Sequence, residues 1–262
     1  MKYPEKVIDF IVNWLKNYAS KYKMKGFVIG VSGGIDSAVT SILCAKTNLP
    51  LLCLDMGIHQ EKNQSSRALN HITWLQKQYD NVNTKSISLT RVFDLFKDSL
   101  PYQENKDLEL LSHANSRARL RMMTLYHFAT LNKYLVAGTG NKVEDFGIGF
   151  YTKYGDGGVD ISPIADLLKS EVYLLASTLG IITEIQNASP TDGLWTDNRT
   201  DEDQIGASYE ELEWAMKNNN LVDFKNISER KSQVISIFSK LKTQNKHKMN
   251  SIPVCKIPLK LK

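Results

Sequence analysis

The chain has 262 residues, of which 42% are hydrophobic and 23% charged, as is ordinary for a globular protein. Its net charge of +5 is mild for a nucleic-acid-binding protein but suits a small polyanion, so we expect no nucleic acid among its partners. No apolar run reaches membrane-spanning length, the N-terminus lacks the apolar core of a signal peptide, and the three cysteines lack metal-site spacing. We therefore expect a cytoplasmic protein without membrane contacts.

Apolar strand patterns alternate with helical patterns, which predicts a doubly wound parallel sheet flanked by helices on both faces. After a first helix over residues 5–22, strands are predicted at residues 27–31, 51–54, about 84–89 and 134–137. Further helices are predicted at residues 36–47, about 65–79, about 107–131, about 166–179, 208–218 and 226–242. No repeat or linker interrupts this α/β pattern, so residues 1–262 are predicted to form a single domain.

The first predicted strand runs into residues 32–37 (SGGIDS), which open the next helix. A strand that turns through glycines into a helix presents unpaired N–H groups and the positive end of a helix dipole, an arrangement that binds anions. No lysine follows, so this is not the loop of ordinary NTPases. Asp36 places a carboxylate beside the bound phosphates, which requires a divalent cation between them. The segment resembles the pyrophosphate loop of the N-type ATP pyrophosphatases; the alternative is a Ser or Asp cap on a plain turn.

The strand at residues 134–137 ends in a second glycine-containing segment, residues 138–144 (GTGNKVE). In doubly wound sheets, ligands collect at the carboxyl ends of strands where the strand order reverses. If this strand lies beside residues 27–31, Thr139 faces the SGGIDS loop and Glu144 offers a second carboxylate to Mg²⁺. The alternative is a turn followed by a solvated helix start.

The long helix carries three arginines within residues 115–122 (NSRARLRM). At about 100° per residue, Arg119 shares a face with apolar residues, whereas Arg117 and Arg121 lie on the opposite side. An arginine in an apolar stripe needs an anion, because removing one partner of a buried ion pair costs about 3–5 kcal/mol. We therefore expect Arg119 to bind a carboxylate or phosphate, and Arg117 and Arg121 to be solvated or at a subunit contact.

Residues 145–160 are polar and glycine-rich and too long for an ordinary connection, which indicates a functional loop. Its segment TKYGDGGVD offers a cation, an aromatic ring and two carboxylates, suited to closing over a charged aromatic ligand. A plain solvent loop is the alternative. By charge, Lys169 in the next helix and Lys248 in the tail are candidates to contact phosphates, with His247 as a neighbouring contact.

Taken in this order, the segments resemble the ammonia-dependent NAD⁺ synthetases. The matching segments are SGGIDS (32–37), NSRARLRM (115–122), GTGNKVE (138–144), TKYGDGGVD (152–160), Lys169, Pro190-Thr191, GASY (206–209) and His247-Lys248. The resemblance implies a Rossmann-like fold of the adenine nucleotide α-hydrolase type. It implies ATP-dependent amidation of nicotinic acid adenine dinucleotide (deamido-NAD⁺) by ammonia through an acyl-adenylate, which releases AMP and pyrophosphate in the last step of NAD⁺ biosynthesis.

The resemblance also implies roles for individual residues. Mg²⁺ is placed at Asp36 and Glu144, and ATP contacts are placed at Gly30, Val31, Ser32, Gly33, Gly34, Ile35, Asp36, Ser37, Thr139, Lys169 and Thr191. Deamido-NAD⁺ is placed near Arg119, Lys153, Asp160, His247 and Lys248. Asp36, Lys169 and Asp160 are the catalytic candidates, with Lys169 balancing the triphosphate charge and Asp160 deprotonating or orienting the ammonium. Family members are homodimers that bind the dinucleotide near the subunit interface.

The sequence departs from the family pattern in three places. The spacing from Glu144 to Thr152 is one residue longer than usual, Pro190-Thr191 continues as DGLW, and the loop at residues 55–60 fits loosely. We expect free ammonia as nitrogen donor, since the chain has no room for a glutaminase domain. Two alternatives stay open: a tRNA-modifying pyrophosphate-loop ATPase, which would need a basic groove and a reactive cysteine, and a nonenzymatic nucleotide-binding sensor.

Overall fold

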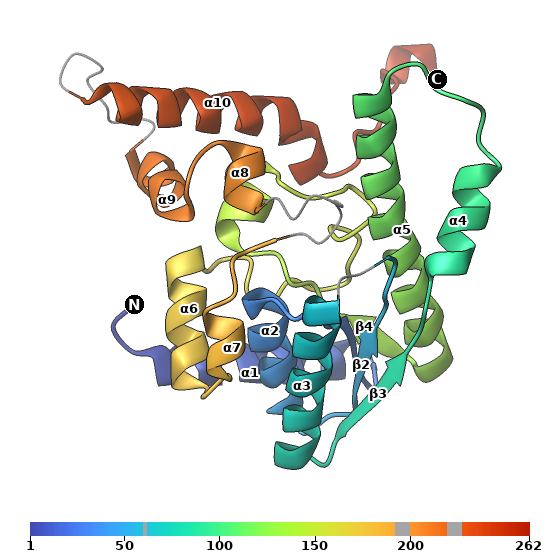
Figure 1. The fold of residues 1–262 in the computed structure, drawn as a ribbon, viewed down its shortest axis with the longest axis vertical. Coiled ribbons are helices and arrows are strands. Elements are labelled where there is room, and N and C mark those ends of the chain that lie inside the picture. The colour runs from blue at the N-terminus through green and yellow to red at the C-terminus, as the bar shows by residue number, and fades with distance from the viewer. Residues whose placement is uncertain (60–61, 192–199, 219–226) are drawn as a thin grey trace.

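The computed structural model describes residues 1–59, 62–191, 200–218 and 227–262. Its sheet has four strands in the order β3-β2-β1-β4 (Figure 1), namely β1 (Gly26–Gly30), β2 (Leu51–Asp55), β3 (Val82–Ser86) and β4 (Tyr134–Val136). β1 pairs in parallel with β2 on one side and with β4 on the other. The strand order therefore reverses at β1, and the predicted parallel sheet, with residues 134–137 beside 27–31, is confirmed.

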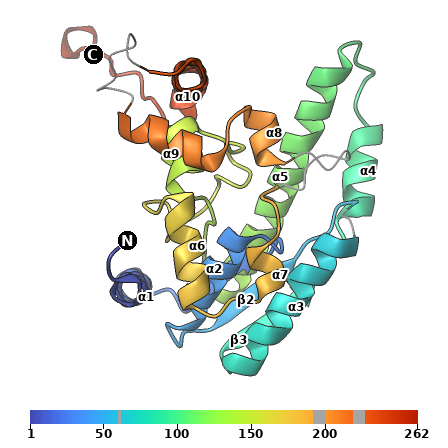
Figure 2. The ribbon, with the colours of Figure 1, turned by 60° about the vertical axis from the view of Figure 1, so that its left-hand side comes forward.

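Helices cover both faces of the sheet (Figure 2). One face packs against α1 (Pro4–Lys21), α2 (Ile35–Ala45), α3 (Lys62–Gln78), α6 (Lys169–Thr178) and α7 (Thr183–Gln186). The other packs against α4 (Thr90–Asp98) and α5 (Lys106–Asn132). Phe27 and Ile29 of β1 enter the first cluster and Val28 the second. The all-apolar strand pattern follows from this double coverage.

A further hydrophobic cluster lies outside the sheet, over the carboxyl ends of the strands (Figure 1). It joins the π-helix η1 (Val143–Ile148), α8 (Asp201–Ile205), α9 (Tyr209–Asn218) and α10 (Glu229–Met249). Leu212 and Phe238 are fully buried in it. We call this second core the helical lobe. It faces the crevice at the carboxyl ends of the strands, where the strand order predicts a ligand-binding site.

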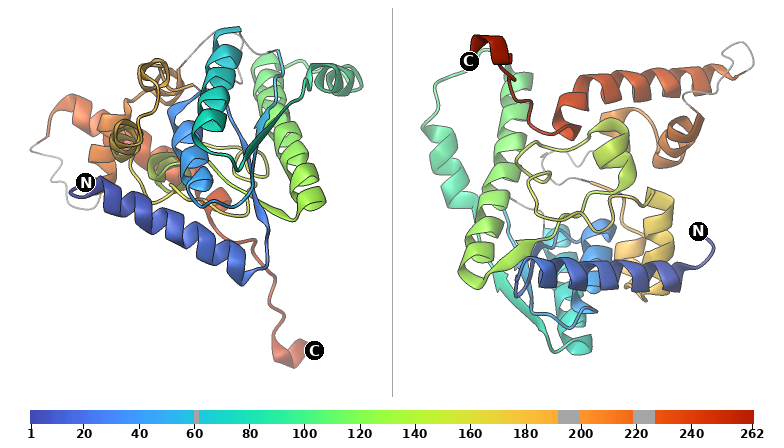
Figure 3. Two further views of the ribbon diagram at one scale, coloured as in Figure 1. Left: turned by 90° about the horizontal axis from the view of Figure 1, so that it is seen from below. Right: turned by 180° about the vertical axis from the view of Figure 1, so that it is seen from behind.

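After α10, the last residues extend away from the rest of the molecule and end in a short 3₁₀ turn, η3 (Leu259–Leu261) (Figure 3). Within the described residues, no helix is both long and apolar enough to cross a membrane.

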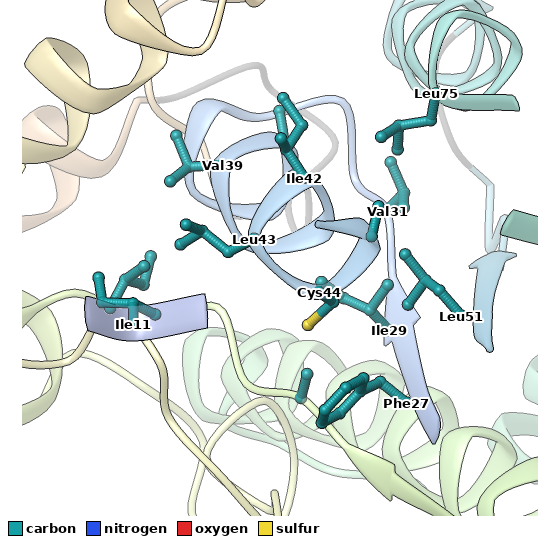
Figure 4. Close-up of a cluster of buried hydrophobic side chains, with 14 of the residues drawn as sticks. Ile11, Phe27, Ile29, Val31, Val39, Ile42, Leu43, Cys44, Leu51 and Leu75 are labelled. Carbon is teal, nitrogen blue, oxygen red and sulfur yellow. The ribbon is translucent and has the colours of Figure 1, made fainter. Parts of the chain in front are cut away.

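The first core fixes the glycine loop that follows β1. Figure 4 shows Cys44 of α2 beside Phe27 and Ile29 of β1, while Val39, Ile42 and Leu43 extend from the same helix into the rest of this cluster, and all six are fully buried. Burying each such side chain contributes about 1.5–3 kcal/mol. The strand before the loop and the helix after it are thus anchored independently, so the loop between them is held at both ends.

Two predicted elements need correction, and α4, α7 and α8 were not predicted. Of α4, only Phe93 is buried. The third strand spans Val82–Ser86 instead of 84–89, because its exposed edge position leaves little apolar pattern to locate it. α10 continues to Met249, so His247 and Lys248 lie on its last turn and not in a tail.

The longer spacing between Glu144 and Thr152 coincides with the π-helix η1. A π-helical turn holds one more residue than an α-helical turn, because its hydrogen bonds run from residue i to i+5. At its end the N–H of Gly149 donates to Glu144 O, five residues earlier. The extra residue is therefore absorbed locally, and Glu144 still reaches the carboxyl edge of the sheet.

Candidate active site

The SGGIDS loop forms an open anion-binding turn at the carboxyl end of β1. Gly34 precedes α2 without a side-chain cap, so the first N–H groups of the helix stay available to a ligand. Ser37 Oγ donates to Gly34 O at 2.9 Å and lies 3.2 Å from Ser32 Oγ, which fixes the turn from inside. Gly33 has φ +82°, which favours glycine. This geometry favours anion binding over the plain capped turn.

A pocket of about 250 Å³ opens from this loop towards α5 and the helical lobe. Every residue predicted to contact ATP lines it except Gly33, and Glu144 lines it too. The DGLW sequence after Thr191 lies outside the described residues. The structure thus brings the residues of four separate sequence segments together in one cavity.

Lys169 is the charge centre of this pocket. Its Nζ lies 2.5 Å from Asp36 Oδ2 and 3.3 Å from Glu144 Oε1, and the residue is only 3% exposed. Burial alone would lower the pKa of Lys169, but the carboxylates of Asp36 and Glu144 outweigh it and raise the pKa. Asn141 Nδ2 donates to the other oxygen of Asp36 at 3.2 Å. The ammonium therefore stays charged and neutralises the two carboxylates expected to hold Mg²⁺.

Tyr209, at the start of α9, orients this cluster from the helical lobe. Its hydroxyl lies 2.5 Å from Glu144 Oε1 and 3.3 Å from Asp201 Oδ2, and its ring centroid lies 4.5 Å from Lys169 Nζ. Burial, followed by Glu144 and Asp201, raises the pKa of Tyr209, so the phenol remains a donor. The sequence placed Tyr209 in a matching segment but gave it no role, because its partners come from distant elements.

The helical lobe also fixes the backbone at Lys169, the first residue of α6. Glu213 of α9 accepts hydrogen bonds from Ser170 N and Ser170 Oγ, both at 2.8 Å. Glu171 accepts from Leu168 N at 2.9 Å. The first turn of α6 is thus held on both sides, which limits where the Lys169 side chain can lie.

The pocket carries an excess of acidic groups. It is lined by two basic side chains, Arg121 and Lys169, and by five acidic ones, namely Asp36, Glu144, Asp145, Asp156 and Asp201. Burial, followed by Glu144, Asp156 and Asp36, raises the pKa of Asp145 to about 8. A polyanionic ligand enters such a pocket only together with cations.

Asp36 and Glu144 fit a magnesium site that is completed by the ligand. Mg²⁺ is usually bound by one or two carboxylates plus substrate phosphates and water. Within the part of the chain that the structure describes, no three or more His, Cys, Asp or Glu side chains form a metal cage. Asp36 and Glu144, beside the anion-binding helix N-terminus, are carboxylates of the kind that Mg²⁺ shares with substrate phosphates.

The loop at residues 152–160 is fixed on α5 and is not a plain solvent loop. Thr152 Oγ1 donates to Asn115 Oδ1 at 2.7 Å. A Cβ at Gly155 would lie 2.8 Å from Ala118 Cβ, and one at Gly158 would lie 2.9 Å from Met122 Cγ. The glycines thus allow the backbone to contact the helix directly.

The cationic residues predicted for the dinucleotide gather beside this loop, outside the lining of the pocket. Arg119 Nη2 donates to Lys153 O at 3.4 Å, and Lys153 Nζ donates to His247 O at 3.2 Å. Lys248 Nζ donates to Tyr151 O at 2.7 Å. They connect α5, the loop and the end of α10 into one basic cluster.

Asp160 has a different setting from the other predicted residues. Its Oδ1 accepts from Tyr126 OH at 3.0 Å and its Oδ2 from Val136 N at 2.8 Å, and it does not line the pocket. Asp156, four residues earlier, does line it, although the family resemblance selected Asp160 and gave Asp156 no role. The proton-accepting role of Asp160 stays a prediction.

The interpretation of the arginines on α5 was partly wrong. Arg119 is exposed, whereas Arg121 lines the pocket and donates from Nε to Met56 O at 3.1 Å. The guanidinium of Arg117 lies 4.8 Å from the ring centroid of Phe93 in α4. α5 is covered by α4 as well as by the sheet, so its buried arc is wider than the apolar stripe suggests.

Comparisons with known proteins agree on one family. Residues 7–252 match the family model described as NAD synthase. The NH(3)-dependent NAD(+) synthetase of Syntrophomonas wolfei is 34% identical over 261 residues, which is 99% of each chain. The NMN synthetase of Francisella tularensis is 32% identical with TM-score 0.82, covering 97% of this chain and 99% of that one. The NH3-dependent NAD synthetase of Campylobacter jejuni is 25% identical with TM-score 0.77, over the same shares of both chains.

Proposed function

The chain belongs to the NAD synthase family, and from this premise we propose that it amidates deamido-NAD⁺ to NAD⁺ with ATP and ammonia in the pocket beside the SGGIDS loop. The observation that carries the assignment of the site is the cluster of Asp36, Glu144 and Lys169 beside an uncapped helix N-terminus. Neither open alternative, the tRNA-modifying ATPase or the nonenzymatic sensor, explains this family membership.

In the first half-reaction, the substrate carboxylate attacks the α-phosphorus of ATP. The bond to the β-phosphoryl group breaks, which gives an acyl-adenylate and pyrophosphate. The chain's part is positioning and charge neutralisation. The N–H groups at the start of α2 hold the departing pyrophosphate, and Lys169 balances its charge.

In the second half-reaction, ammonia attacks the acyl carbon and AMP leaves with the electrons of the acyl–oxygen bond. The nitrogen must lose a proton to form the amide, so a carboxylate near the acyl group is needed. Asp156 lines the pocket and Asp160 does not, although both carboxylates accept hydrogen bonds, Asp156 from Thr152 N and Asp160 from Tyr126 OH and Val136 N. We therefore favour Asp156 as the proton acceptor, with Asp160 holding the loop against β4 and α5.

We propose Mg²⁺ as the metal, held by Asp36 and Glu144 together with phosphate oxygens. When bound, it neutralises phosphoryl charge and orients the pyrophosphate as a leaving group. The five acidic and two basic side chains of the pocket support this proposal, because ATP would otherwise meet net negative charge. Lys169 then exchanges part of its contact with the carboxylates for the phosphates.

We also propose a homodimer of single-domain subunits. Apolar side chains of α4 and α5 are 45–62% exposed, namely Val92, Leu95, Phe96, Leu108, Leu110 and Leu111. Monomers rarely expose apolar patches larger than a few hundred Å². Two-fold symmetric pairing would bury the same face on both copies.

Three free cysteines support a cytoplasmic location.

One observation favours a second candidate substrate. The chain is 32% identical to a protein named as an NMN synthetase over nearly its whole length. Amidating the nicotinic acid mononucleotide would use the same activation of the same carboxylate. The two substrates are separated by measuring kcat/KM for each in competition; a preference for the mononucleotide would reassign the substrate and keep the chemistry.

Asp36→Ala tests the assignment of the site. Removing this carboxylate leaves Mg²⁺ with one protein ligand, so kcat for NAD⁺ formation should fall by roughly 10²–10³-fold while the circular dichroism spectrum stays unchanged. Asp166→Ala is the matched control, since the Asp166 side chain is 96% exposed and should be silent. Near-normal kcat of Asp36→Ala at saturating Mg²⁺ would reject the metal role.

Efficient use of glutamine by the purified chain would contradict ammonia as donor.

A further inference from the structure

The side chain of Asn141 connects the two carboxylates assigned above to Mg²⁺, and it is fully buried. Its Nδ2 donates to Asp36 Oδ1 at 3.2 Å, and its Oδ1 accepts from Val143 N at 3.1 Å and from Glu144 N at 3.2 Å. One amide thus contacts the side chain of the first carboxylate residue and the backbone of the second, although Asn141 and Asp36 are 105 positions apart in the chain.

These hydrogen bonds allow the Asn141 amide a single orientation. Two backbone N–H groups face its oxygen, so only its nitrogen can face the Asp36 carboxylate. A flipped amide would place donor against donor at the start of η1 and oxygen against oxygen at Asp36. Because buried polar groups depend on such contacts, the amide is held in the observed orientation.

The backbone on either side of this amide is fixed as well. Lys142 N donates to Leu167 O at 2.8 Å, in the stretch that leads into α6, and Asp145 N donates to Asn141 O at 2.9 Å. The side chain of Val143 is fully buried in the helical lobe. Asn141 is therefore a rigid support for Asp36, because it is anchored by elements other than the SGGIDS loop.

Asn141 and Lys169 divide the two oxygens of Asp36 between them. Oδ1 faces the Asn141 amide, and Oδ2 lies 2.5 Å from Lys169 Nζ. When phosphates draw Lys169 away, as proposed above, Oδ2 becomes available to a cation while Oδ1 stays hydrogen-bonded. The carboxylate then offers one oxygen in a fixed direction, which is how hydrogen-bonded partners orient the ligands of a metal.

We propose that Asn141 is a positioning residue that makes the site selective for Mg²⁺ over the larger Ca²⁺. It limits Asp36 to one available oxygen and fixes the start of η1, from which Glu144 extends. Mg²⁺ requires near-octahedral geometry with short bonds, whereas Ca²⁺ takes more oxygens, including both of one carboxylate, at longer distances. The proposal rests on the proposed function and adds the residue that decides which ion fits.

Two variants separate the contacts of the amide. In Asn141→Ser the hydroxyl can still accept from the N–H groups at the start of η1, as serine does at the start of many helices, but it is too short to reach Asp36. Asn141→Ala removes both contacts. Asp36 is therefore free to turn in both variants, whereas only Asn141→Ala also loses the support of η1.

Calorimetric titration with the α,β-methylene analogue of ATP, which cannot be cleaved between these phosphates, measures the selectivity without turnover. The parent should bind the analogue roughly tenfold more tightly, or better, with Mg²⁺ than with Ca²⁺. In both Asn141 variants this ratio should fall about tenfold, because binding with Mg²⁺ weakens.

Asn81→Ser is the matched control for the Asn141 variants. Asn81 Nδ2 also makes hydrogen bonds inside the protein, to Ala45 O and Leu49 O, but the residue does not line the pocket. This variant should keep the parental ratio of Mg²⁺ to Ca²⁺ affinity even if its Tm falls.

A merely structural role of Asn141 would change the Tm and not the ratio. Thermal denaturation without metal should give Asn141→Ser a Tm close to that of the parent and Asn141→Ala a lower one. Both variants lose the contact to Asp36, so either one that folds decides the question. A parental ratio in a folded Asn141 variant would overturn the proposal.

NAD⁺ formation by the parent is assayed alongside the titrations. A parent that forms NAD⁺ but binds the analogue equally well with both ions overturns the role of Asn141 alone. A parent that shows the expected preference for Mg²⁺ but forms no NAD⁺ overturns the proposed function alone.

Discussion

Single side chains decide how the pocket holds its charge. Asp36, Glu144 and Lys169 could be predicted from the sequence, because each follows a glycine turn or begins a helix at the expected place. Tyr209 and Arg121 could not, because their contacts depend on how the helical lobe and α5 pack over the sheet. The choice between Asp156 and Asp160 likewise needed the structure, in which Asp156 lines the pocket and Asp160 does not.

Tyr209→Phe isolates the contribution of one hydroxyl. The ring beside Lys169 is kept, but Glu144 and Asp201 lose a hydrogen-bond partner. A lost hydrogen bond to a charged group costs about 1.5–3 kcal/mol, so Glu144 should be less well oriented and half-saturation by Mg²⁺ should rise about tenfold. The measurement is Mg²⁺ dependence of AMP release, with thermal denaturation as the check on folding.

Tyr18→Phe, on α1 and away from the pocket, serves as the control for Tyr209→Phe. Unchanged Mg²⁺ dependence in Tyr209→Phe would mean that the hydroxyl does not orient Glu144.

Among the elements, those buried on both sides were the easiest to predict. β1, β2 and β4 coincide with apolar runs to within a residue or so, since each lies inside the sheet or under a helix. β3, of which only Val82 is buried, and α4, of which only Phe93 is buried, gave too little pattern. The only sequence indication of the π-helix η1 was the longer spacing between Glu144 and Thr152, because one added residue produces no periodic pattern.

Gly155→Ala tests the contact between the loop and α5. The added Cβ would lie 2.8 Å from Ala118 Cβ and 2.9 Å from Thr152 Cβ, so the loop must move away from the helix. KM for the dinucleotide should rise about tenfold or more, since Lys153 moves with the loop, while KM for ATP changes little. Steady-state kinetics with each substrate varied in turn gives both values.

The matched control for Gly155→Ala is Gly57→Ala, where an added Cβ meets nothing within 4 Å. If both variants keep parental kinetics, the close approach of the loop to α5 has no bearing on substrate binding.

At the scale of the whole molecule, the sheet with its two faces was predictable but the second core was not. The helices of the lobe contact one another more than the sheet, and their order along the chain does not say where they lie. The pocket lies between the two cores, so its walls come from distant parts of the chain. Each of these parts had to be identified from its own sequence motif. Charge and composition only indicated the class of ligand.

Stability of the whole fold should depend on His71, buried between α2 and α3. Its Nε2 lies 2.9 Å from Ser41 Oγ, and burial lowers the pKa of His71 from 6.5 to about 4. Above pH 6.5 the ring is neutral in both states and contributes no pH dependence. Between pH 6.5 and about 4 only the unfolded chain takes the proton, so the free energy of unfolding falls by about 3 kcal/mol in total. Below about pH 4 the folded chain is protonated too, and the loss levels off.

Urea denaturation at pH 7 and pH 5 measures this dependence. The difference between the two pH values should shrink by about 2 kcal/mol in His71→Gln relative to the parent. The exposed His127, changed to Gln, should leave the difference as it is in the parent. An identical pH dependence in parent and His71→Gln would show that the buried ring does not govern acid sensitivity.

The salt bridge between Asp36 and Lys169 spans 133 positions along the chain. During synthesis on the ribosome, the glycine turn emerges early, but its acid stays without a counterion until α6 has been made, and without its orienting phenol until α9 has been made. A nascent or truncated polypeptide without α6 therefore carries the turn with its carboxylate unneutralised, which disfavours the binding of a polyanionic nucleotide.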